Sequence, residues 1–483
     1  MRKRIKQLEK LASALDPNGD ERASLLEKVI GYTNGFLDNI EQMPTYVPTD
    51  DKGMGLYDSP ISEEPIDIDE ALGLLKRNVD RPGLNIGSDG YLAFIPGSGL
   101  YTSALGDYIA AVTNRYAGIF FASPGAVRME RMLLAWIADF IGYPKRAAGD
   151  LTSGGSIANL VGIVTARDGH HLRAKDFTRS VVYLTKQTHH SVEKALRIAG
   201  LKECVERTVP IDECYRMKPE ALEDAILGDK KAGLNPWLIV ATAGTTDTGA
   251  VDPLVPIADI AQAHQLWLHV DGAYGAAFAL CNEGKQKLKG LERSDSLIID
   301  PHKGFFLPFG SGAVLVRDGE KLQQAHHYDA DYLQDQDQLA SSDETSPADL
   351  SPELSRPFRA LRLWLPLKLA GVAPFRAALE EKLLLARYFY EKIQQIDGFE
   401  AGPYPDLSIV TYRYIPERGD VNQFNRRLNH AVQHDGRVFL SSTSIDGRFT
   451  LRLAVLGFRA HLDTIDRAIE ILQEKAKEIE RLY

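Results

Sequence analysis

Short apolar runs alternate with helical stretches between about residue 81 and residue 375, and this alternation restricts the folds open to the chain. Five of the runs are typical of strands with apolar residues on both faces: VVYLT (181–185), PWLIVATAG (236–244), LWLHVDGAYG (266–275), SLIID (296–300) and GAVLVRD (312–318). Strands that are buried on both faces and separated by helices indicate a largely parallel sheet covered on both sides. The sequence therefore predicts an α/β domain over residues 81–375.

The segments on either side of this region have different patterns. Residues 1–80 look helical in pieces and are interrupted by QMPTYVPTDDKG and DSPISEEP. Such a segment has little core of its own, so we expect it to pack on another surface, for example a second subunit. Residues 376–483 combine a long amphipathic helix, two strand-like runs (SIVTYRY and RFTLRLAVLG) and two further helices. This mixture predicts a small α+β domain.

Composition excludes several classes of protein. The chain has 483 residues, which is enough for more than one domain, and a net charge of −10, which argues against a nucleic-acid binder. No stretch reaches the roughly 18 apolar residues that a bilayer span needs, and the basic N-terminus lacks the apolar core of a signal peptide. The three cysteines form no CxxC pair, which argues against a disulfide framework. We expect a cytoplasmic protein that binds neither membrane nor metal.

Chemistry-bearing residues follow the predicted strands, at the edge of the sheet where ligands bind in parallel α/β folds. In DLTSGGSIANL, Gly155 and Ser156 stand just before a helical run. Glycines allow a ligand to approach the backbone closely, and the start of a helix attracts a phosphate. A glycine turn with a serine N-cap is the alternative interpretation.

Two further strands end in polar side chains. Asp271 follows the run LWLHV, and a buried carboxylate is costly unless it has a cationic or proton-donating partner. Ala273 beside it leaves room for a flat group, whereas a helix N-cap is the alternative reading of this acid. His189 and His190 follow the run at 181–185, where each could also be a packing or surface residue.

His302 and Lys303 follow the run SLIID in the heptapeptide DPHKGFF. A lone lysine at a strand end is usually a surface residue with its amine in water. The neighbours of this lysine are apolar: Ile298, Ile299, Phe305 and Phe306. A lysine that is kept from water becomes a nucleophilic amine, which is the behaviour required to form a Schiff base with an aldehyde.

Together these features predict pyridoxal 5′-phosphate (PLP) as the cofactor. The lysine would hold the aldehyde, and the helix start would bind the phosphate. The carboxylate would keep the pyridine nitrogen protonated, so that the ring can accept electrons. A histidine could stack on one face of the ring, and a small residue could cover the other face.

The sequence resembles the group II PLP-dependent amino acid decarboxylases of fold type I, in particular the aromatic-L-amino-acid decarboxylases, over residues 81–460. Several motifs carry the resemblance in the family's order: ASPGAVRME (122–130), HHSVEKA (189–195), ATAGTT (241–246), HVDGAYGAA (269–277) and DPHKG (300–304). The resemblance implies a large domain with a seven-stranded, largely parallel sheet and a small C-terminal α+β domain. It also implies an obligate homodimer with interfacial active sites, which suits an N-terminal helical segment that has little core of its own.

The resemblance implies roles for individual residues. Lys303 would form the Schiff base, Asp271 would pair with the pyridine nitrogen, and His189, rather than His190, would stack on the ring. Ala273 would lie against the ring and Thr246 near its 3-hydroxyl group. Four residues would surround the phosphate: Gly155, Ser156, Asp300 and His302. The role of Asp300 is open, because an asparagine is usual in the family and a second acid near a phosphate is unfavourable.

The substrate pocket and the catalytic loop are less regular. Phe94 and Pro96, in YLAFIPGSG (91–99), would line the substrate pocket, with Tyr332 as a further candidate. Alignment on RPFRALRLW (356–364) places Pro347 or Ala348 where the family carries a loop tyrosine that protonates Cα. The acidic segment that contains Tyr332 could be a surface loop or a flap over the site. Gly304 stands where a tryptophan is common.

We therefore expect PLP-dependent decarboxylation of an L-amino acid to the amine and CO2. Cα would be protonated by His189, by Tyr332 or by a residue of the other subunit. If this step is slow, oxygen could divert the reaction to an aldehyde, ammonia and peroxide. Another PLP-dependent carbon–carbon lyase and a catalytically silent PLP-binding protein are the remaining alternatives. The sequence leaves the amino acid open between aromatic and acidic substrates.

Overall fold

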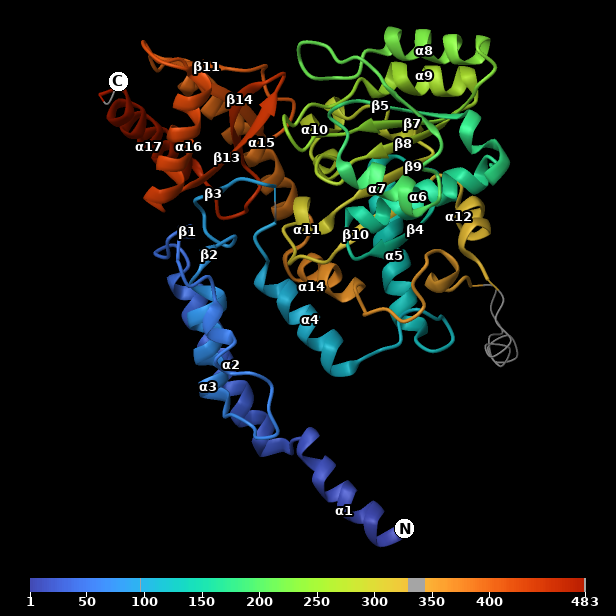
Figure 1. Cartoon of the computed structure of the whole chain (residues 1–483). Helices are drawn as coiled ribbons and strands as arrows, with labels where there is room; N and C mark the ends of the chain where they lie inside the picture. Colours follow the sequence, from blue (N-terminus) through green and yellow to red (C-terminus); the bar gives the residue numbers. More distant parts are fainter. Residues whose placement is uncertain (96, 329–343, 482–483) are drawn as a thin grey trace.

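The computed structural model describes residues 1–95, 97–328 and 344–481. An N-terminal group of helices, a large sheet with helices on both faces and a smaller sheet with helices follow one another along the chain (Figure 1). Within these described ranges, no helix combines the length and the apolar composition that a membrane crossing requires.

Seven strands form the large sheet in the order β4-β10-β9-β8-β7-β5-β6. Their bounds are β4 Ala148–Thr152, β5 Ser180–Leu184, β6 Val205–Thr208, β7 Asn235–Thr242, β8 Trp267–Asp271, β9 Ser296–Ile299 and β10 Gly312–Val316. Strands β5 to β9 pair in parallel, and β10 runs antiparallel to both β9 and β4. The predicted seven-stranded, largely parallel sheet is confirmed. The short strands β4 and β6 are not among the five runs that the sequence predicted.

Helices bury both faces of this sheet. In β5, Val182 and Leu184 belong to the same buried cluster as residues of α6, α7 and α12, whereas Val181 and Tyr183 cluster with residues of α5, α8 and α9. All four side chains are at most 4% exposed, and each of the three aliphatic ones contributes about 1.5–3 kcal/mol by leaving water. The helix bounds are α5 Pro124–Ile141, α6 Gly155–Gly169, α7 His190–Ile198, α8 Pro219–Lys231, α9 Leu254–His264 and α12 Gly319–His326.

The C-terminal part contains a five-stranded sheet in the order β11-β12-β14-β13-β3. The elements are β3 Tyr91–Leu92, β11 Phe399–Ala401, β12 Ile409–Tyr414, β13 Phe439–Ile445, β14 Arg448–Ala454, α15 Ala373–Ile393, α16 Val421–Asp435 and α17 Leu462–Glu480. Strand β3 pairs in parallel with β13, although the predicted boundary at residue 81 assigns it to the large domain. The chain therefore crosses to the small sheet before it enters the large one.

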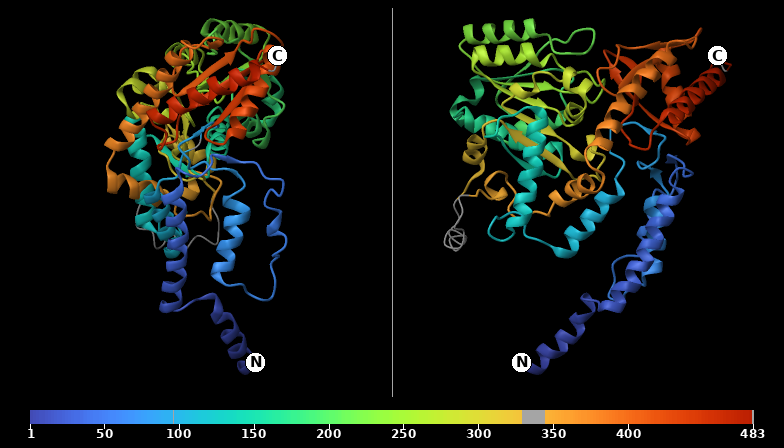
Figure 2. Two further views of the ribbon diagram at one scale, coloured as in Figure 1. Left: turned by 90° about the vertical axis from the view of Figure 1, so that its left-hand side faces the viewer. Right: turned by 180° about the vertical axis from the view of Figure 1, so that it is seen from behind.

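The N-terminal helices project away from the rest of the molecule (Figures 1 and 2). These are α1 Arg2–Ala12, α2 Gly19–Asn39 and α3 Ile68–Leu75, with β1 Tyr46–Val47 and β2 Gly83–Leu84 at their base. No residue of α1, α2 or α3 is buried. Four apolar side chains of α2 are 37–45% exposed: Leu25, Leu26, Val29 and Ile30. Helices α1 to α3 therefore form no core with one another.

A buried ionic cluster fastens the segment after residue 343 to the large sheet. The fully buried guanidinium of Arg356 pairs with Glu130 of α5 at 2.9 Å and with Asp150 of β4, and it also donates to the carbonyl of Leu151. Burial raises the pKa of Asp150 to about 7, although Arg356 favours the ionised carboxylate. Because β4 leads directly into the turn before α6, this cluster also holds one wall of the site described below.

We expect Arg356→Met to lower the free energy of unfolding by about 3–5 kcal/mol, because two buried carboxylates would lose their cation. Urea unfolding at pH 7 measures the change. Arg437→Met is a suitable control, because Arg437 is 51% exposed in its pair with Asp435, and its loss should have a much smaller effect. Equal, small effects in the two variants would contradict a stabilising role for the cluster.

Candidate active site

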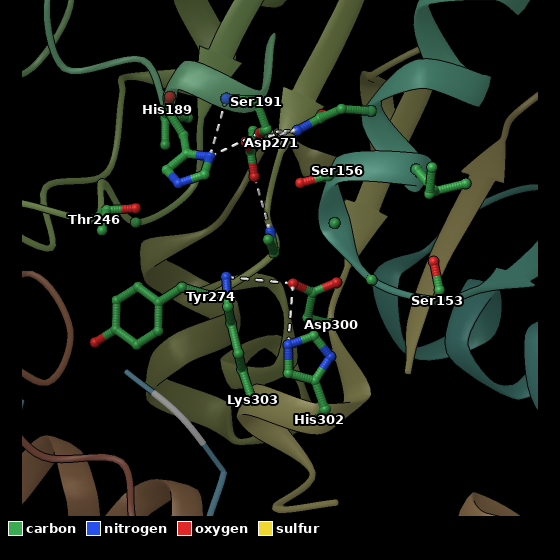
Figure 3. A pocket seen from close by; sticks show the side chains of 17 residues that line it. Ser153, Ser156, His189, Ser191, Thr246, Asp271, Tyr274, Asp300, His302 and Lys303 are labelled. Carbon is green, nitrogen blue, oxygen red and sulfur yellow. Dashed lines mark hydrogen bonds and ion pairs between the residues drawn. The ribbon is translucent and has the colours of Figure 1, made fainter. Parts of the chain in front are cut away.

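One cavity of about 290 Å³ lies at the carboxyl ends of the parallel strands. The turn before α6 and the segments after β5, β7, β8 and β9 all contribute to it (Figure 3). All nine residues that the sequence assigned to the cofactor line this cavity: Gly155, Ser156, His189, Thr246, Asp271, Ala273, Asp300, His302 and Lys303. Residues separated by almost 150 positions in the chain thus meet at one edge of the sheet.

The turn between β4 and α6 forms one end of the cavity. Gly154, the N-cap of α6, has a φ of +152°, a conformation that is essentially restricted to glycine. A Cβ on Gly155 would lie 2.9 Å from Oδ2 of Asp300, so glycine allows the two segments to approach. The first N–H groups of α6 have no partner within the helix, and the helix dipole favours an anion there. Ser153 and Ser156 line the same end, which suits a phosphate group.

Asp271 lies at the end of β8 and is only 6% exposed. Its Oδ1 accepts a hydrogen bond from the backbone N–H of Ala273, and its Oδ2 accepts one from Nδ2 of Asn159, both at 3.1 Å. Neither donor carries a charge, so neither neutralises this carboxylate. A protonated ring nitrogen placed in the cavity would find in Asp271 a charged acceptor.

His189 is the N-cap of α7. Its Nδ1 lies 2.7 Å from Oγ of Ser191 and 3.3 Å from the backbone nitrogen of Ser191. Burial lowers the pKa of His189, and the positive end of the helix dipole also disfavours an imidazolium at this position. His189 therefore presents an uncharged aromatic ring to the cavity, with the ring of His190 packed 4.0 Å away between centroids.

Lys303 belongs to the single-turn helix α11, Pro301–Gly304, which follows β9. Its Nζ lies 3.3 Å from Oδ2 of Asp300, and Nε2 of His302 lies 3.7 Å from the same oxygen. Burial raises the pKa of Asp300, whereas the ammonium of Lys303 favours the ionised carboxylate and opposes this shift. The amine is thus not surrounded by apolar groups alone. Asp300 has the position of a counter-charge to Lys303.

Packing explains the glycine that follows the lysine. A Cβ on Gly304 would lie 2.2 Å from Cβ of Ala277, in the 3₁₀ turn η5, Ala276–Leu280. A tryptophan could not enter here unless η5 moved. The missing side chain therefore reflects the close approach of α11 to η5, not an opening beside Lys303.

The segment that contains Phe94 lies against the lysine turn. The N–H of Gly97 donates to the carbonyl of His302 at 2.8 Å, and the N–H of Leu100 donates to that of Phe306 at 3.0 Å. The ring of Phe94 is 55% exposed and neighbours Tyr91 and Phe439, an arrangement that leaves it available for contacts. Pro96 and Tyr332, the other two pocket candidates, lie outside the described residues.

The positions aligned with the family's loop tyrosine are packed into the protein. Pro347 is buried at the start of the 3₁₀ turn η8, Pro347–Asp349. The N–H of Ala348 donates to the carbonyl of Gly118 at 3.0 Å. Neither residue carries a group that could donate a proton to Cα.

Sequence reasoning missed Asn159, Ser191 and Tyr274, which also line the cavity. Asn159 stands four residues after Gly155 on α6, and this spacing places both on one face of the helix. This spacing could have identified Asn159 as a cavity residue from the sequence. The hydroxyl of Tyr274 reaches Oγ of Ser408 at 2.6 Å, a contact between distant parts of the chain that no local pattern indicates.

The cavity fits pyridoxal phosphate in three respects. A glycine turn and a helix start offer donors for a phosphate, Asp271 offers a charged acceptor for a ring nitrogen, and Lys303 offers an amine for an aldehyde. His189 and Ala273 supply a flat ring and a small side chain for the two faces of a planar group. Among the described residues, no cluster of three or more His, Cys, Asp or Glu side chains could hold a metal ion.

Comparison with known proteins agrees with this chemistry. The model of the pyridoxal-dependent decarboxylase conserved domain matches residues 53–415. The chain is 33% identical to an aromatic-L-amino-acid decarboxylase from Bacillus atrophaeus, covering 88% of each protein. It is 31% identical to tryptophan decarboxylase 2 from Oryza sativa subsp. japonica, covering 81% of each. It is also 30% identical to a phenylacetaldehyde synthase from Petunia hybrida, over 97% of this chain and 96% of that protein.

The solved structure of Oryza sativa TDC with PLP and tryptamine has the same fold, with a TM-score of 0.89 and 28% identity. The match covers 96% of this chain and 99% of that one. Since the family model spans well over half of the sequence, the chain belongs to the pyridoxal-dependent decarboxylases and is a PLP-dependent amino acid decarboxylase.

Proposed function

We propose that this enzyme converts an aromatic L-amino acid to its amine and CO2, with Lys303, Asp271 and His189 as the catalytic residues. The observation that carries the proposal is the position of Lys303 and Asp271. They follow the neighbouring strands β9 and β8 and line the same cavity. An amine for the aldehyde and an acceptor for the ring nitrogen are the two groups that this chemistry requires.

The cofactor, when bound, supplies an aldehyde for the substrate's amino group and a ring that accepts the electron pair left by CO2. Gly155, Ser156 and His302 would hold its phosphate, and Asp271 would retain a proton on its ring nitrogen. Lys303 would bind the aldehyde carbon between turnovers and carry a proton when released, with Asp300 as the counter-charge of its ammonium form. His189 would cover one face of the ring and exclude water from it.

Two features support an aromatic substrate. Phe94, Tyr91 and Phe439 form an aromatic cluster outside the cavity lining, with ring centroids 6.1–6.5 Å apart. The N–H of Gly97, three residues after Phe94, bonds the carbonyl of His302 in the lysine turn. The described residues that line the cavity include no arginine, the side chain best suited to the second carboxylate of an acidic substrate. The relatives named above as aromatic-L-amino-acid and tryptophan decarboxylases point the same way.

The assembly belongs to the same proposal. The N-terminal helices α1 to α3 have no buried residue, and α2 exposes four apolar side chains. A second copy of the chain would cover this surface, so we expect a homodimer whose active sites lie at the interface. We also place the enzyme in the cytoplasm, since Cys204, Cys214 and Cys281 are all free thiols.

Oxidative deamination to an aldehyde is a second candidate. Pro347 and Ala348 stand where the family's loop tyrosine is expected, and neither can donate a proton. A relative of 30% identity is a phenylacetaldehyde synthase. Amine formation remains the first candidate, because Tyr332 or a residue of the partner subunit would supply the proton instead.

A panel of amino acids tests the substrate and the product together. We expect tryptophan, tyrosine or phenylalanine to release CO2 and amine in equal amounts, and aspartate and glutamate to release at least about tenfold less CO2. CO2, amine, aldehyde and peroxide are measured in parallel. Preference for an acidic substrate would contradict the proposed substrate class, and aldehyde with peroxide in place of amine would establish the second candidate.

Lys303→Ala should abolish the visible absorbance that PLP shows when it is attached to the protein. It should also reduce turnover by at least about a thousandfold, because the amine that holds and releases the aldehyde is removed. Absorbance and CO2 release measure the two effects. Lys289→Ala, at an exposed position, is the control and should keep both properties. An unchanged spectrum in Lys303→Ala would refute the assignment.

Asp271→Asn should still fold, because the asparagine oxygen can accept the N–H of Ala273, although its amide nitrogen would then face Nδ2 of Asn159. We expect kcat to fall by at least about a hundredfold, since a neutral amide cannot keep the ring nitrogen protonated. Thermal unfolding and steady-state kinetics measure the two quantities. Asp229→Asn removes an equally buried carboxylate that binds Tyr183, and it should reduce stability but not kcat. A near-normal kcat in Asp271→Asn would contradict the role of Asp271.

A further inference from the structure

A chain of buried polar side chains lies behind Asp271, and the proposed function does not use it. Trp267, Ser296, His269 and Asn159 come from β8, β9 and α6 and are each at most 2% exposed. A Cβ on Gly162 of α6 would lie 2.8 Å from Cε1 of His269, so a glycine makes room for this ring. Buried polar groups are costly unless they are hydrogen-bonded, so the contacts between these side chains indicate where each hydrogen lies.

The donors and acceptors that each side chain carries determine the direction of each hydrogen bond. The indole N–H of Trp267 can only donate, and it donates to Oγ of Ser296 at 2.8 Å. Nδ1 of His269 lies 2.8 Å from the same oxygen. Burial lowers the pKa of His269 to about 4, so its ring is neutral and carries a single N–H. Only one of its two nitrogens can therefore donate.

The hydrogen bonds of Asn159, at the other end of this series of polar side chains, determine which nitrogen of His269 donates. An ionised carboxylate only accepts, so the amide of Asn159 must turn its Nδ2 towards Oδ2 of Asp271, at 3.1 Å. Its Oδ1 then faces Nε2 of His269 at 2.8 Å and needs a donor. Nε2 of His269 therefore carries the hydrogen, and Nδ1 accepts the hydroxyl hydrogen of Ser296.

The second hydrogen on Nδ2 of Asn159 connects the amide to His189 through Ser191. This hydrogen is donated to Oγ of Ser191 at 2.9 Å, and the same Oγ lies 2.7 Å from Nδ1 of His189 and can donate its own hydrogen to it. The backbone N–H of Ser191 points at the same nitrogen. The hydrogen of His189 therefore lies on Nε2, which points away from Ser191 into the part of the cavity between Thr246 and Lys303 (Figure 3).

We propose that Asn159 is a positioning residue whose single amide holds Asp271 as an acceptor and His189 in its Nε2–H form. Trp267, Ser296 and His269 hold that amide in place. This inference rests on the proposed function, because it assigns roles to groups around the same cofactor. It also has a consequence for the reaction: His189 is a hydrogen-bond donor to the substrate and not the acid that protonates Cα. An imidazolium would direct its Nδ1–H against the N–H of Ser191.

Nitrogen NMR of histidine rings tests the hydrogen positions without turnover. In PLP-loaded enzyme with ¹⁵N-labelled histidine at pH 7, we expect His269 and His189 to carry hydrogen on Nε2 alone. The variant His269→Gln identifies the signals of His269 by their loss. A hydrogen on Nδ1 of either ring, or a doubly protonated ring, would overturn the proposal.

Kinetics of two buried asparagines test the positioning role. Asn159→Ala should lower kcat about 10- to 100-fold, with KM changed less than about threefold, and should alter the absorbance spectrum of the bound cofactor. Asn425→Ala is the matched control: Asn425 is 0% exposed on α16 and bonds Tyr414 in the small domain. It should lower thermal stability and leave kcat and the spectrum unchanged. Equal losses of kcat in the two variants, or none in Asn159→Ala, would contradict the proposal.

A pair of variants at His269 separates positioning from packing. Glutamine offers a side-chain N–H near the place of Nε2, so His269→Gln should keep kcat within about threefold of wild type, whereas His269→Leu should resemble Asn159→Ala. Equal activities in the two variants would refute the role of the bond to Asn159. If wild-type enzyme released CO2 from no amino acid, the proposed function would fail, but the ring-nitrogen and absorbance measurements would still decide the positioning inference.

Discussion

The carboxylate of Asp271 is the group around which the site is arranged, because a buried charge is costly unless donors face it. It stands at the end of β8, between two helix-covered faces, and receives one bond from the backbone and one from Asn159. Asn159 is held by His269, two residues before Asp271 on the same strand. The neighbouring strand β9 leads into Lys303. The parallel sheet thus places the acceptor and the amine at one edge, each with its own support.

The two acids of the cavity illustrate how surroundings separate the roles of chemically identical groups. Asp271 is met by neutral donors and keeps its charge available for a cofactor. Asp300 is met by Lys303 and His302, and its charge is used within the protein. Gly155 allows Asp300 to lie directly behind the phosphate turn, and the approach is close enough that a Cβ would contact Oδ2. The same Oδ2 lies 3.3 Å from Nζ of Lys303, so this acid has a cationic partner although it lies close to the glycine turn.

The small sheet also contributes to the site. Arg452 of β14 is buried and donates to the carbonyls of Thr246 and Asp247, next to the cavity. Tyr274, which lines the cavity, bonds Ser408 beside β12. The segment from Gly97 to Leu100 bonds the turn that carries Lys303. Movement of the small sheet would therefore alter the positions of cavity residues, which makes the interface of the two sheets part of the active site's structure.

The sequence by itself determined the strand-end residues, the cofactor, the family and five of the seven large-sheet strands. Each of these depends on local pattern: apolar runs, a glycine turn before a helix, and short motifs in order. Tertiary structure alone decided that Asp300 turns to Lys303, that Gly304 packs on Ala277, that β3 joins the C-terminal sheet, and that Asn159 links Asp271 to His189. These features depend on contacts between residues far apart in the chain. A periodic pattern tells which face of an element is buried, but it does not tell which side chain will lie against that face.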